Sequence, residues 1–167
     1  MNIRKARTED LAPIMRIYRN AQDFMIESGN PGQWGHEYPS GELIRQDISG
    51  GNCYVLENEK EICAVFALFE GIEPAYRIIE QGEWLNDEPY VTVHRVAKDR
   101  NSKGVVRMIH KFLAANYSNI RIDTHEKNLP MRSALIRNGF SECGIIYVRD
   151  HSPRIAYQWA NKGGNEV

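Results

Sequence analysis

The stretch from residue 90 to residue 112 constrains the fold of this chain more than any other. It reads as a strand at 90–97, a polar loop at 98–104 and an amphipathic helix that begins near Gly104. The first amides of a helix have no acceptor within that helix, so a glycine turn that leads into one can bind phosphate. The segment therefore predicts an anion site, and four basic side chains surround it: Lys98, Arg100, Lys103 and Arg107.

Length and composition bound the remaining possibilities. The chain has 167 residues, 42% of them hydrophobic and 26% charged, which is typical of one globular domain; we place it at 1–160, with a frayed tail at 161–167. A formal net charge of −1 argues against a nucleic-acid partner. No apolar run approaches the roughly 20 residues of a membrane helix, and the first residues lack the apolar core of a secretion signal. We therefore expect no membrane partner and a cytoplasmic location.

The cysteines are few and far apart. The chain has 3 of them, Cys53, Cys63 and Cys143, and none forms a C-x-x-C pair. Each lies in an apolar run, where a small buried side chain is the usual role of a free cysteine. The sequence thus predicts neither a disulfide framework nor a metal site, and it argues against Cys143 as an acyl carrier.

The hydrophobic periodicity predicts an α/β (α+β) domain. Hairpins in the first half and crossover helices in the second indicate a mixed, mostly antiparallel central sheet of six to seven strands with helices on both faces. A helix that begins after Ser40 carries Leu43, Ile44, Asp47 and Ile48. Besides the strand at 90–97, we expect strands at 2–6, 52–57, 61–69, 120–125, 140–148 and 154–159, and further helices at 11–25 and 130–138.

Two motifs at a fixed spacing give a resemblance to a known family. The loop from Arg100 to Val106 resembles the pyrophosphate loop of the GNAT superfamily of N-acetyltransferases, in which Gln or Arg precedes a Gly by three residues and a Gly or Ala follows that Gly by two. Asn101 takes the first place, Gly104 matches, and Val106 departs from the pattern. The segment 128–140, an Asn that leads a helix ending in Gly-Phe, resembles the superfamily's later motif. The resemblance covers essentially the whole chain.

The resemblance implies that acetyl-coenzyme A is the co-substrate. The strand at 90–97 would splay from its parallel neighbour at 120–125, and its backbone at His94, Arg95, Val96 and Ala97 would bind the pantetheine arm. Asn128 would bond a pantetheine amide, and the basic side chains would meet the 3′-phosphate. The amides that would receive the pyrophosphate are those of Asn101, Ser102, Lys103, Gly104, Val105 and Val106.

The implied reaction is direct acetyl transfer to a primary amine of a small molecule within a ternary complex, with the thioester polarised by an amide near Val96. The tyrosine that many members place seven residues after the Asn is Leu135 here, so that general acid is absent. Strand alternation places His94 and Arg95 on opposite faces. Candidates for the base are His94, then Glu88 and Asp123, with Glu70 or Glu73 also open.

Each candidate base also has a structural reading. His94 can be a histidine hydrogen-bonded to a neighbouring strand, and Glu88 can be a solvated or salt-bridged side chain. Asp123 shares a strand face with His125, so the two could relay a proton, or they could pair with Arg121 or Arg154.

The acceptor and the assembly stay open at this point. The loop before the second helix holds an aromatic and acidic cluster that suits a cationic amine, although Trp34 reads equally well as an anchor on the core. Val106 and Leu135 leave open a coenzyme A-binding sensor without transferase activity, and acetylation of a protein N-terminus or lysine is a further alternative. Terminal strands pair between subunits in this superfamily, so a homodimer is also possible. The loop cluster comprises Gln33, Trp34, His36, Glu37 and Tyr38.

Overall fold

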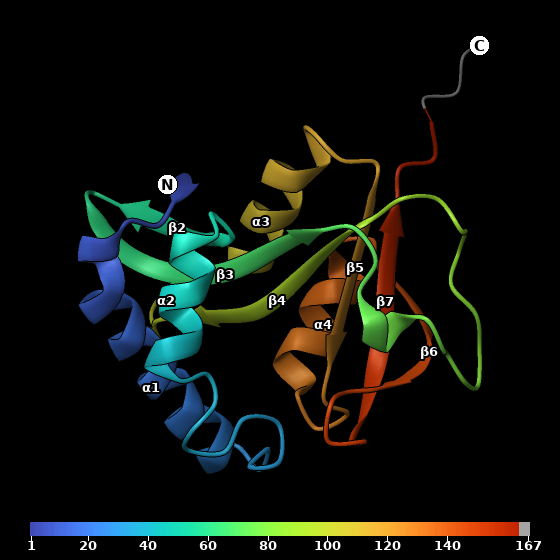
Figure 1. Ribbon diagram of the computed structural model, residues 1–167, viewed down its shortest axis with the longest axis horizontal. Helices are drawn as coiled ribbons and strands as arrows, with labels where there is room; N and C mark the ends of the chain where they lie inside the picture. The colour runs from blue at the N-terminus through green and yellow to red at the C-terminus, as the bar shows by residue number, and fades with distance from the viewer. Residues whose placement is uncertain (164–167) are drawn as a thin grey trace. The chain divides into compact units, whose positions relative to one another are not determined.

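The computed structural model describes residues 1–163, and the order of helices and strands predicted from the sequence is confirmed within them (Figure 1). Of the predicted tail, residues 164–167 lie outside the described residues. The strands are β1 (Asn2–Lys5), β2 (Cys53–Asn58), β3 (Glu61–Glu70), β4 (Val91–Lys98), β5 (Asn119–Thr124), β6 (Ser141–Tyr147) and β7 (Pro153–Ala160). The helices are α1 (Leu11–Glu27), α2 (Gly41–Ser49), α3 (Val105–Ala114) and α4 (Leu129–Arg137), with short 3-10 turns at Thr8–Asp10 and Pro74–Tyr76.

Within the described residues the strands form a seven-stranded sheet in the order β1-β2-β3-β4-β5-β7-β6. The pairs β1–β2, β2–β3, β5–β7 and β7–β6 are antiparallel. β4 and β5 are parallel, with Val91 opposite Ile120 and Thr92 opposite Arg121. The predicted mixed, mostly antiparallel sheet with one parallel pair is therefore confirmed. The predicted parting of the two parallel strands stays a prediction.

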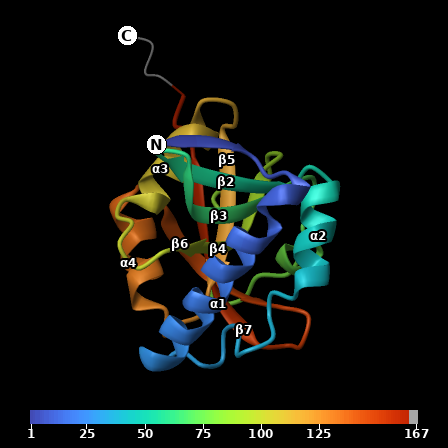
Figure 2. The same cartoon turned by 90° about the vertical axis from the view of Figure 1, so that its left-hand side faces the viewer.

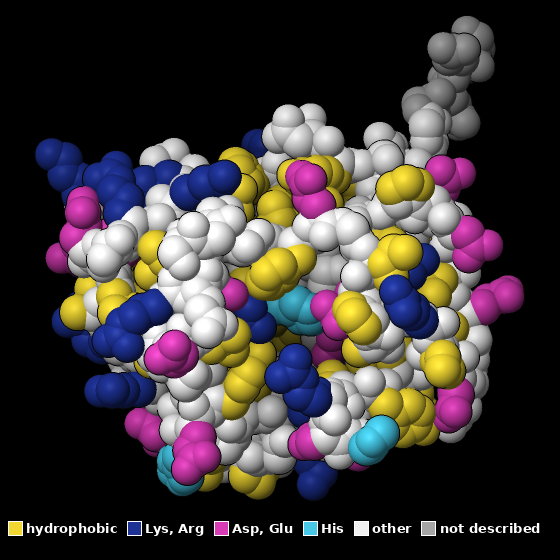
Figure 3. Space-filling view, in the orientation of Figure 1, with side chains coloured by type: hydrophobic (Ala, Val, Ile, Leu, Met, Phe, Trp, Pro, Cys, Tyr) yellow, Lys and Arg dark blue, Asp and Glu magenta, His cyan; other side chains and the backbone are white. Residues whose placement is uncertain are grey.

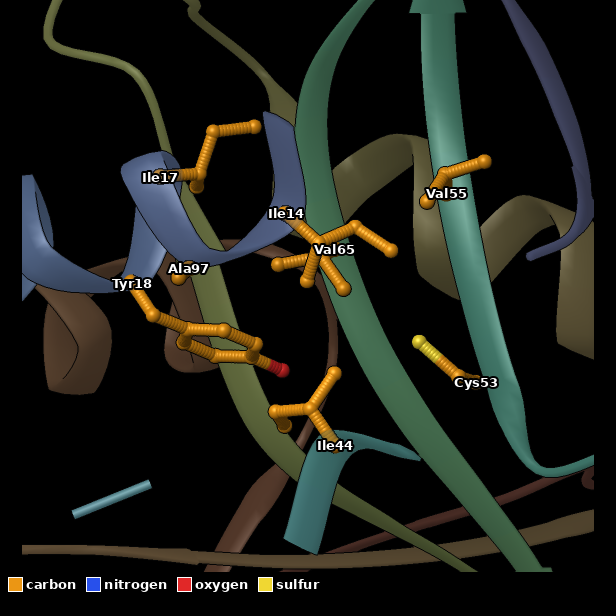
Figure 4. Packing of buried hydrophobic residues seen from close by; sticks show 8 residues of the cluster. All are labelled: Ile14, Ile17, Tyr18, Ile44, Cys53, Val55, Val65 and Ala97. Atoms are coloured by element: carbon orange, nitrogen blue, oxygen red, sulfur yellow. The ribbon is translucent and has the colours of Figure 1, made fainter. Parts of the chain in front are cut away.

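The chain divides into two compact units, and the first comprises residues 1–69 and 93–105. Its helices α1 and α2 lie on the same side of β2 and β3 in both ribbon views (Figures 1 and 2). Ser40 begins α2 by accepting a 3.2 Å hydrogen bond from the Leu43 amide, as its sequence position predicts. Figure 4 shows the core side chains that these elements turn toward one another: Ile14, Ile17, Tyr18, Ile44, Cys53, Val55, Val65 and Ala97.

The second unit comprises residues 70–92 and the chain from residue 106 onward. Its core includes Tyr76, Ile146 and Ala156, against which Trp84 packs. The segment that precedes β4 pairs with β6 through two backbone hydrogen bonds between Glu80 and Ile145, at 2.8 and 2.9 Å. This contact needs glycine, because a Cβ at Gly82 would lie 1.9 Å from the Cys143 carbonyl oxygen.

The three cysteines are buried and free, as the sequence predicts. Burial raises the pKa of Cys53 to about 12 and also raises the pKa of Cys143. Thiolates are therefore disfavoured at both positions, which agrees with a packing role for these side chains. No helix among residues 1–163 is both long and apolar enough to cross a membrane.

Candidate functional site

The loop between β4 and α3 has the geometry of an anion site at Gly104. This residue has a φ of 71°, in the left-handed region that favours glycine. A Cβ built there would meet nothing within 4 Å, so its surroundings are open. α3 begins at the next residue, Val105, and the amides of its first turn have no acceptor within the helix. An anion at this point would meet free amides and the positive end of the helix dipole.

Asp99 occupies part of the loop that the sequence assigns to phosphate. Its carboxylate accepts hydrogen bonds from the amides of Asn101 at 3.0 Å and Ser102 at 2.7 Å. The Lys98 ammonium donates to the Ser102 carbonyl oxygen at 2.8 Å, and the Asp99 amide donates to the Cys63 carbonyl oxygen at 2.9 Å. The loop is thus braced internally and tied to β3. Two of the six predicted phosphate donors already have an acceptor in this structure.

The basic side chains of the loop differ in their surroundings. Arg100 forms a 2.9 Å ion pair with Glu27 at the end of α1, and its guanidinium carbon lies 5.8 Å from the centroid of the Phe24 ring. Lys103 and Arg107 are exposed. On the face drawn in Figure 3, side chains of both charges are interspersed with hydrophobic ones, in keeping with the small net charge.

Arg95 is the unusual residue of β4. It has a φ of 55°, a left-handed conformation inside a strand. Its guanidinium makes two hydrogen bonds to the Asp47 carboxylate, at 2.9 and 2.8 Å, and one to the Tyr38 hydroxyl at 3.0 Å. Its carbonyl oxygen accepts a 2.7 Å hydrogen bond from the Tyr18 hydroxyl. Side chain and main chain of this residue are therefore both held by α1, α2 and the loop between them.

The predicted alternation of faces along β4 is wrong at this point. The His94 ring lies 5.8 Å from the Phe69 ring, centroid to centroid, and the Arg95 guanidinium carbon lies 5.4 Å from the same Phe69 centroid. Neighbouring residues of a regular strand point to opposite faces, so they could not share a contact in this way. The left-handed φ of Arg95 rotates the backbone and is the physical reason for the difference.

Asp47 is a functional candidate that the sequence reasoning passed over. Burial raises the pKa of its carboxyl, and the Arg95 guanidinium opposes part of that rise. The sequence did indicate this residue, because Asp47 stands among the apolar positions of the second helix, where a charged side chain needs a buried partner. The conformation of Arg95 left no such signal, since left-handed residues in strands are not marked by residue type.

In the second unit, Asp123 accepts a 2.6 Å hydrogen bond from the Tyr76 hydroxyl. Burial, with the nearby Asp123, raises the pKa of Tyr76 well above its usual value, so this hydroxyl stays protonated and donates. Arg121, considered as a partner for Asp123, instead packs against aromatic rings. Its guanidinium carbon lies 4.1 Å from the centroid of the Trp84 ring and 3.9 Å from the centroid of the Tyr90 ring. Tyr76, in a segment with irregular spacing, is a second residue that the sequence reasoning missed.

The remaining carboxylates and His125 have mostly local roles. Glu88 is exposed. Glu70 accepts a 2.7 Å hydrogen bond from the Tyr117 hydroxyl, and Glu73 caps the 3-10 turn that follows it. His125 accepts a 3.1 Å hydrogen bond from the Lys127 amide, and burial lowers its pKa. Among residues 1–163, no three His, Cys, Asp or Glu side chains are placed to hold a metal ion together.

The helix of the second motif has the predicted caps. Asn128 precedes α4 and accepts a 3.3 Å hydrogen bond from the Met131 amide. Gly139 follows the helix with a φ of 84°, as expected at a C-cap. Leu135, at the place of the family's tyrosine, is 1% exposed and belongs to the core. The structural roles of this motif are confirmed, and the coenzyme role of Asn128 stays a prediction.

The loop between α1 and α2 favours the anchoring role for Trp34. Its ring meets the rings of Tyr18 and Tyr38 edge-on, with centroid distances of 5.8 and 6.2 Å, and it packs against the core of the first unit. His36 and Glu37 are exposed, and Gln33 is half-buried. The expected contact of this loop with an acceptor stays a prediction.

Comparison with known proteins points to one family. No family model and no curated protein matches the chain. Among solved structures, a GNAT-family acetyltransferase from Streptococcus agalactiae is 28% identical, with a TM-score of 0.89 over 96% of this chain and 95% of its own. A GNAT-family acetyltransferase from Listeria monocytogenes is 21% identical, with a TM-score of 0.68 over 95% of this chain and 94% of its own.

One more distant structure shares the fold. The ribosomal-protein-S18-alanine N-acetyltransferase of Escherichia coli is 13% identical, with a TM-score of 0.62 over 99% of this chain and 97% of its own. All three of these structures carry the name of an acetyltransferase. The resemblance supports acetyl transfer as the general activity of this chain.

Proposed function

We propose that this chain, which resembles a GNAT-family acetyltransferase over nearly its whole length, transfers the acetyl group of acetyl-coenzyme A to a primary amine of a small molecule. The observation that carries the proposal is Gly104, left-handed and open to its surroundings, directly before the first amides of α3. Pyrophosphate fits this arrangement, since free amides, a helix dipole and nearby basic side chains all favour an anion.

The coenzyme would lie along β4 and its following loop. The amides of Lys103, Gly104, Val105 and Val106 would hold the pyrophosphate; those of Asn101 and Ser102 brace the loop through Asp99 instead. Val106 contributes a main-chain amide, so its β-branched side chain does not by itself remove a donor. The backbone of β4 from His94 to Ala97 would run beside the pantetheine arm. Asn128 would bond a pantetheine amide.

The proposed chemistry is direct aminolysis of a thioester. The neutral amine nitrogen attacks the acetyl carbonyl carbon, a C–N bond forms, and the C–S bond breaks. The amine proton passes to a base, and the departing thiolate takes a proton to become free coenzyme A. We assign the base first to His94, which is half-buried on β4, with Asp123 and Glu88 as alternatives.

Two alternatives differ from this proposal, one in the acceptor and the other in the absence of acetyl transfer. Acetylation of a protein N-terminus is an alternative; a structure with the same fold is named a ribosomal-protein-S18-alanine N-acetyltransferase. A sensor that binds the coenzyme without transfer is another, because Leu135 is buried where a thiol-protonating tyrosine is usual. We place the reaction in the cytoplasm, where the three free cysteines would stay reduced.

The first test measures release of free thiol from acetyl-coenzyme A with panels of small amines and of peptides. We expect release only when an amine is present, and faster with small amines than with peptides. Gly104→Ala should raise the KM for acetyl-coenzyme A by about tenfold, because the added Cβ disfavours the left-handed φ on which the loop depends.

Gly71→Ala is the matched control. Gly71 also has a positive φ, 86°, and open surroundings, but it follows β3 and belongs to the second unit. The two variants should lose similar stability, and only Gly104→Ala should change the KM. Thermal stabilisation by acetyl-coenzyme A without thiol release across both panels would favour the sensor. No stabilisation and no release would rule out the proposed function.

A further inference from the structure

Arg95 combines a strained backbone with an unusual number of restraints. Other described residues with positive φ that are not glycine, Glu59, Lys60, Gln81 and His151, lie in turns or bends between strands. Arg95 alone among them lies within a strand. A left-handed conformation is unfavourable for a residue that carries a Cβ atom, so it persists only where the surroundings impose it.

The restraints come from three segments of the first unit. Asp47 of α2 holds the guanidinium in a bidentate ion pair, and the side chains of Asp47 and Arg95 are only 5% and 10% exposed. Tyr38, in the loop before α2, accepts a 3.0 Å hydrogen bond from the Arg95 guanidinium through its hydroxyl oxygen. Tyr18 of α1, fully buried, donates to the Arg95 carbonyl oxygen. Planar, two-point pairing fixes the direction of a guanidinium as well as its position.

We propose that Asp47, Tyr18 and Tyr38 are positioning residues, which hold Arg95 left-handed and so aim the neighbouring β4 amide at the acetyl end of the coenzyme. A left-handed residue within a strand disrupts the ladder locally and turns the next peptide group out of its regular direction. The inference rests on the proposed function and on the role that the family resemblance implies for the amide near Val96, which would polarise the thioester carbonyl. It explains why a buried carboxylate on α2 is aimed at a residue of the coenzyme strand.

The expected kinetic signature follows from the place of this amide. A donor that stabilises the charge developing on the carbonyl oxygen acts in the transition state, so its loss lowers kcat. The pyrophosphate contacts lie further along the chain, at Gly104 and α3, and should be unaffected. The positioning residues should therefore change kcat much more than the KM for acetyl-coenzyme A.

The experiment compares Asp47→Asn and Tyr18→Phe with Asp10→Asn as control. Asp10 is also buried and also pairs with an arginine through two hydrogen bonds, at 2.8 and 3.1 Å to Arg4, but its arginine has an ordinary φ. We expect kcat to fall about tenfold or more in the two test variants, the KM for acetyl-coenzyme A to stay within about twofold, and the control to retain wild-type kinetics.

Two further measurements separate positioning from simple stability. The three-bond coupling between the amide and α protons of Arg95 reports its φ directly, with or without activity, and it should change in Asp47→Asn and Tyr18→Phe only. The double variant Asp47→Asn with Arg95→Gly should recover part of the lost kcat, because glycine adopts the left-handed conformation without a restraint.

The outcomes are distinguishable. If wild-type protein releases no thiol, the proposed function fails, and the coupling constant still tests whether these residues hold Arg95. An unchanged coupling in both test variants overturns the inference, as does a changed coupling with wild-type kcat. Equal loss of kcat in Asp10→Asn would mean general destabilisation and would also overturn it. If Asp47→Asn does not fold, Tyr18→Phe, which removes one hydroxyl, decides.

Discussion

Two arginine–aspartate pairs in the first unit have the same chemistry and different consequences. Arg4 and Asp10 make two hydrogen bonds at 2.8 and 3.1 Å, and Arg95 and Asp47 make two at 2.9 and 2.8 Å. Arg4 has a second carboxylate, that of Glu57, at 2.7 Å, whereas the further contact of Arg95 is a hydroxyl. Arg4 thus has two carboxylate partners, whereas Arg95 has one. Removing a single carboxylate should therefore affect them unequally.

The two carboxyl groups also titrate in opposite directions. The hydrogen bond from Arg4 lowers the pKa of Asp10 below its usual value. Burial raises the pKa of Asp47, because the favourable interaction with Arg95 offsets only part of the cost of removing the charge from water. The hydrogen bond from Arg4 thus favours the charged form of Asp10, whereas burial opposes the charged form of Asp47.

The largest expected effect is on stability. Asp47→Asn should lower the free energy of unfolding by about 3 kcal/mol or more, because it leaves a buried guanidinium without its carboxylate. Asp10→Asn should cost only about 1 to 2 kcal/mol, because Arg4 keeps Glu57 and the main loss is one set of hydrogen bonds. Urea unfolding at neutral pH measures both changes. Equal losses would contradict the view that duplication of partners distinguishes the pairs.

The contrast also marks how far the sequence leads. Strands and helices followed from periodicity, and Ser40, Asn128 and Gly139 had the predicted capping roles because capping depends on one side chain and a few adjacent amides. The open glycine before α3 was likewise predictable, because a short motif encodes it. Features of this kind are local in the chain, and local chemistry is visible in a sequence.

Contacts between distant segments were less accessible. The place of Asp47 among apolar positions indicated that it needs a buried partner. That this partner is Arg95, 48 residues further along the chain, was not predictable from spacing. The Tyr76–Asp123 hydrogen bond joins an irregular segment to β5, and no sequence pattern predicted it. The occupation of two loop amides by Asp99 was local, yet it was missed because the family motif assigns those amides to phosphate.

The pH dependence of stability should separate the pairs by sign. In the unfolded chain an aspartate has a pKa of about 3.9. The pKa of Asp10 is lower in the folded protein, so its stabilising contribution is present above the unfolded value and is lost as the pH falls through the folded one. The pKa of Asp47 is higher in the folded protein, so stability falls as the pH rises from the unfolded value through the folded one.

Unfolding free energies measured between about pH 3 and pH 7 test this difference. The stability of wild type relative to Asp10→Asn should grow with pH, and that relative to Asp47→Asn should shrink over the range where the folded Asp47 titrates. Parallel curves for the two variants would show that burial does not distinguish these carboxyl groups.

The smallest expected effect is at a third pair, Arg100 with Glu27, whose side chains are 56% and 61% exposed. Glu27→Gln should change the free energy of unfolding by less than about 0.5 kcal/mol, because water screens such a pair. It should nevertheless strengthen binding of acetyl-coenzyme A slightly at low salt, since Arg100 beside the loop loses a competing carboxylate. Titration calorimetry at two ionic strengths measures the gain. If Glu27→Gln costs as much stability as Asp10→Asn, burial is not what sets the order of the three pairs.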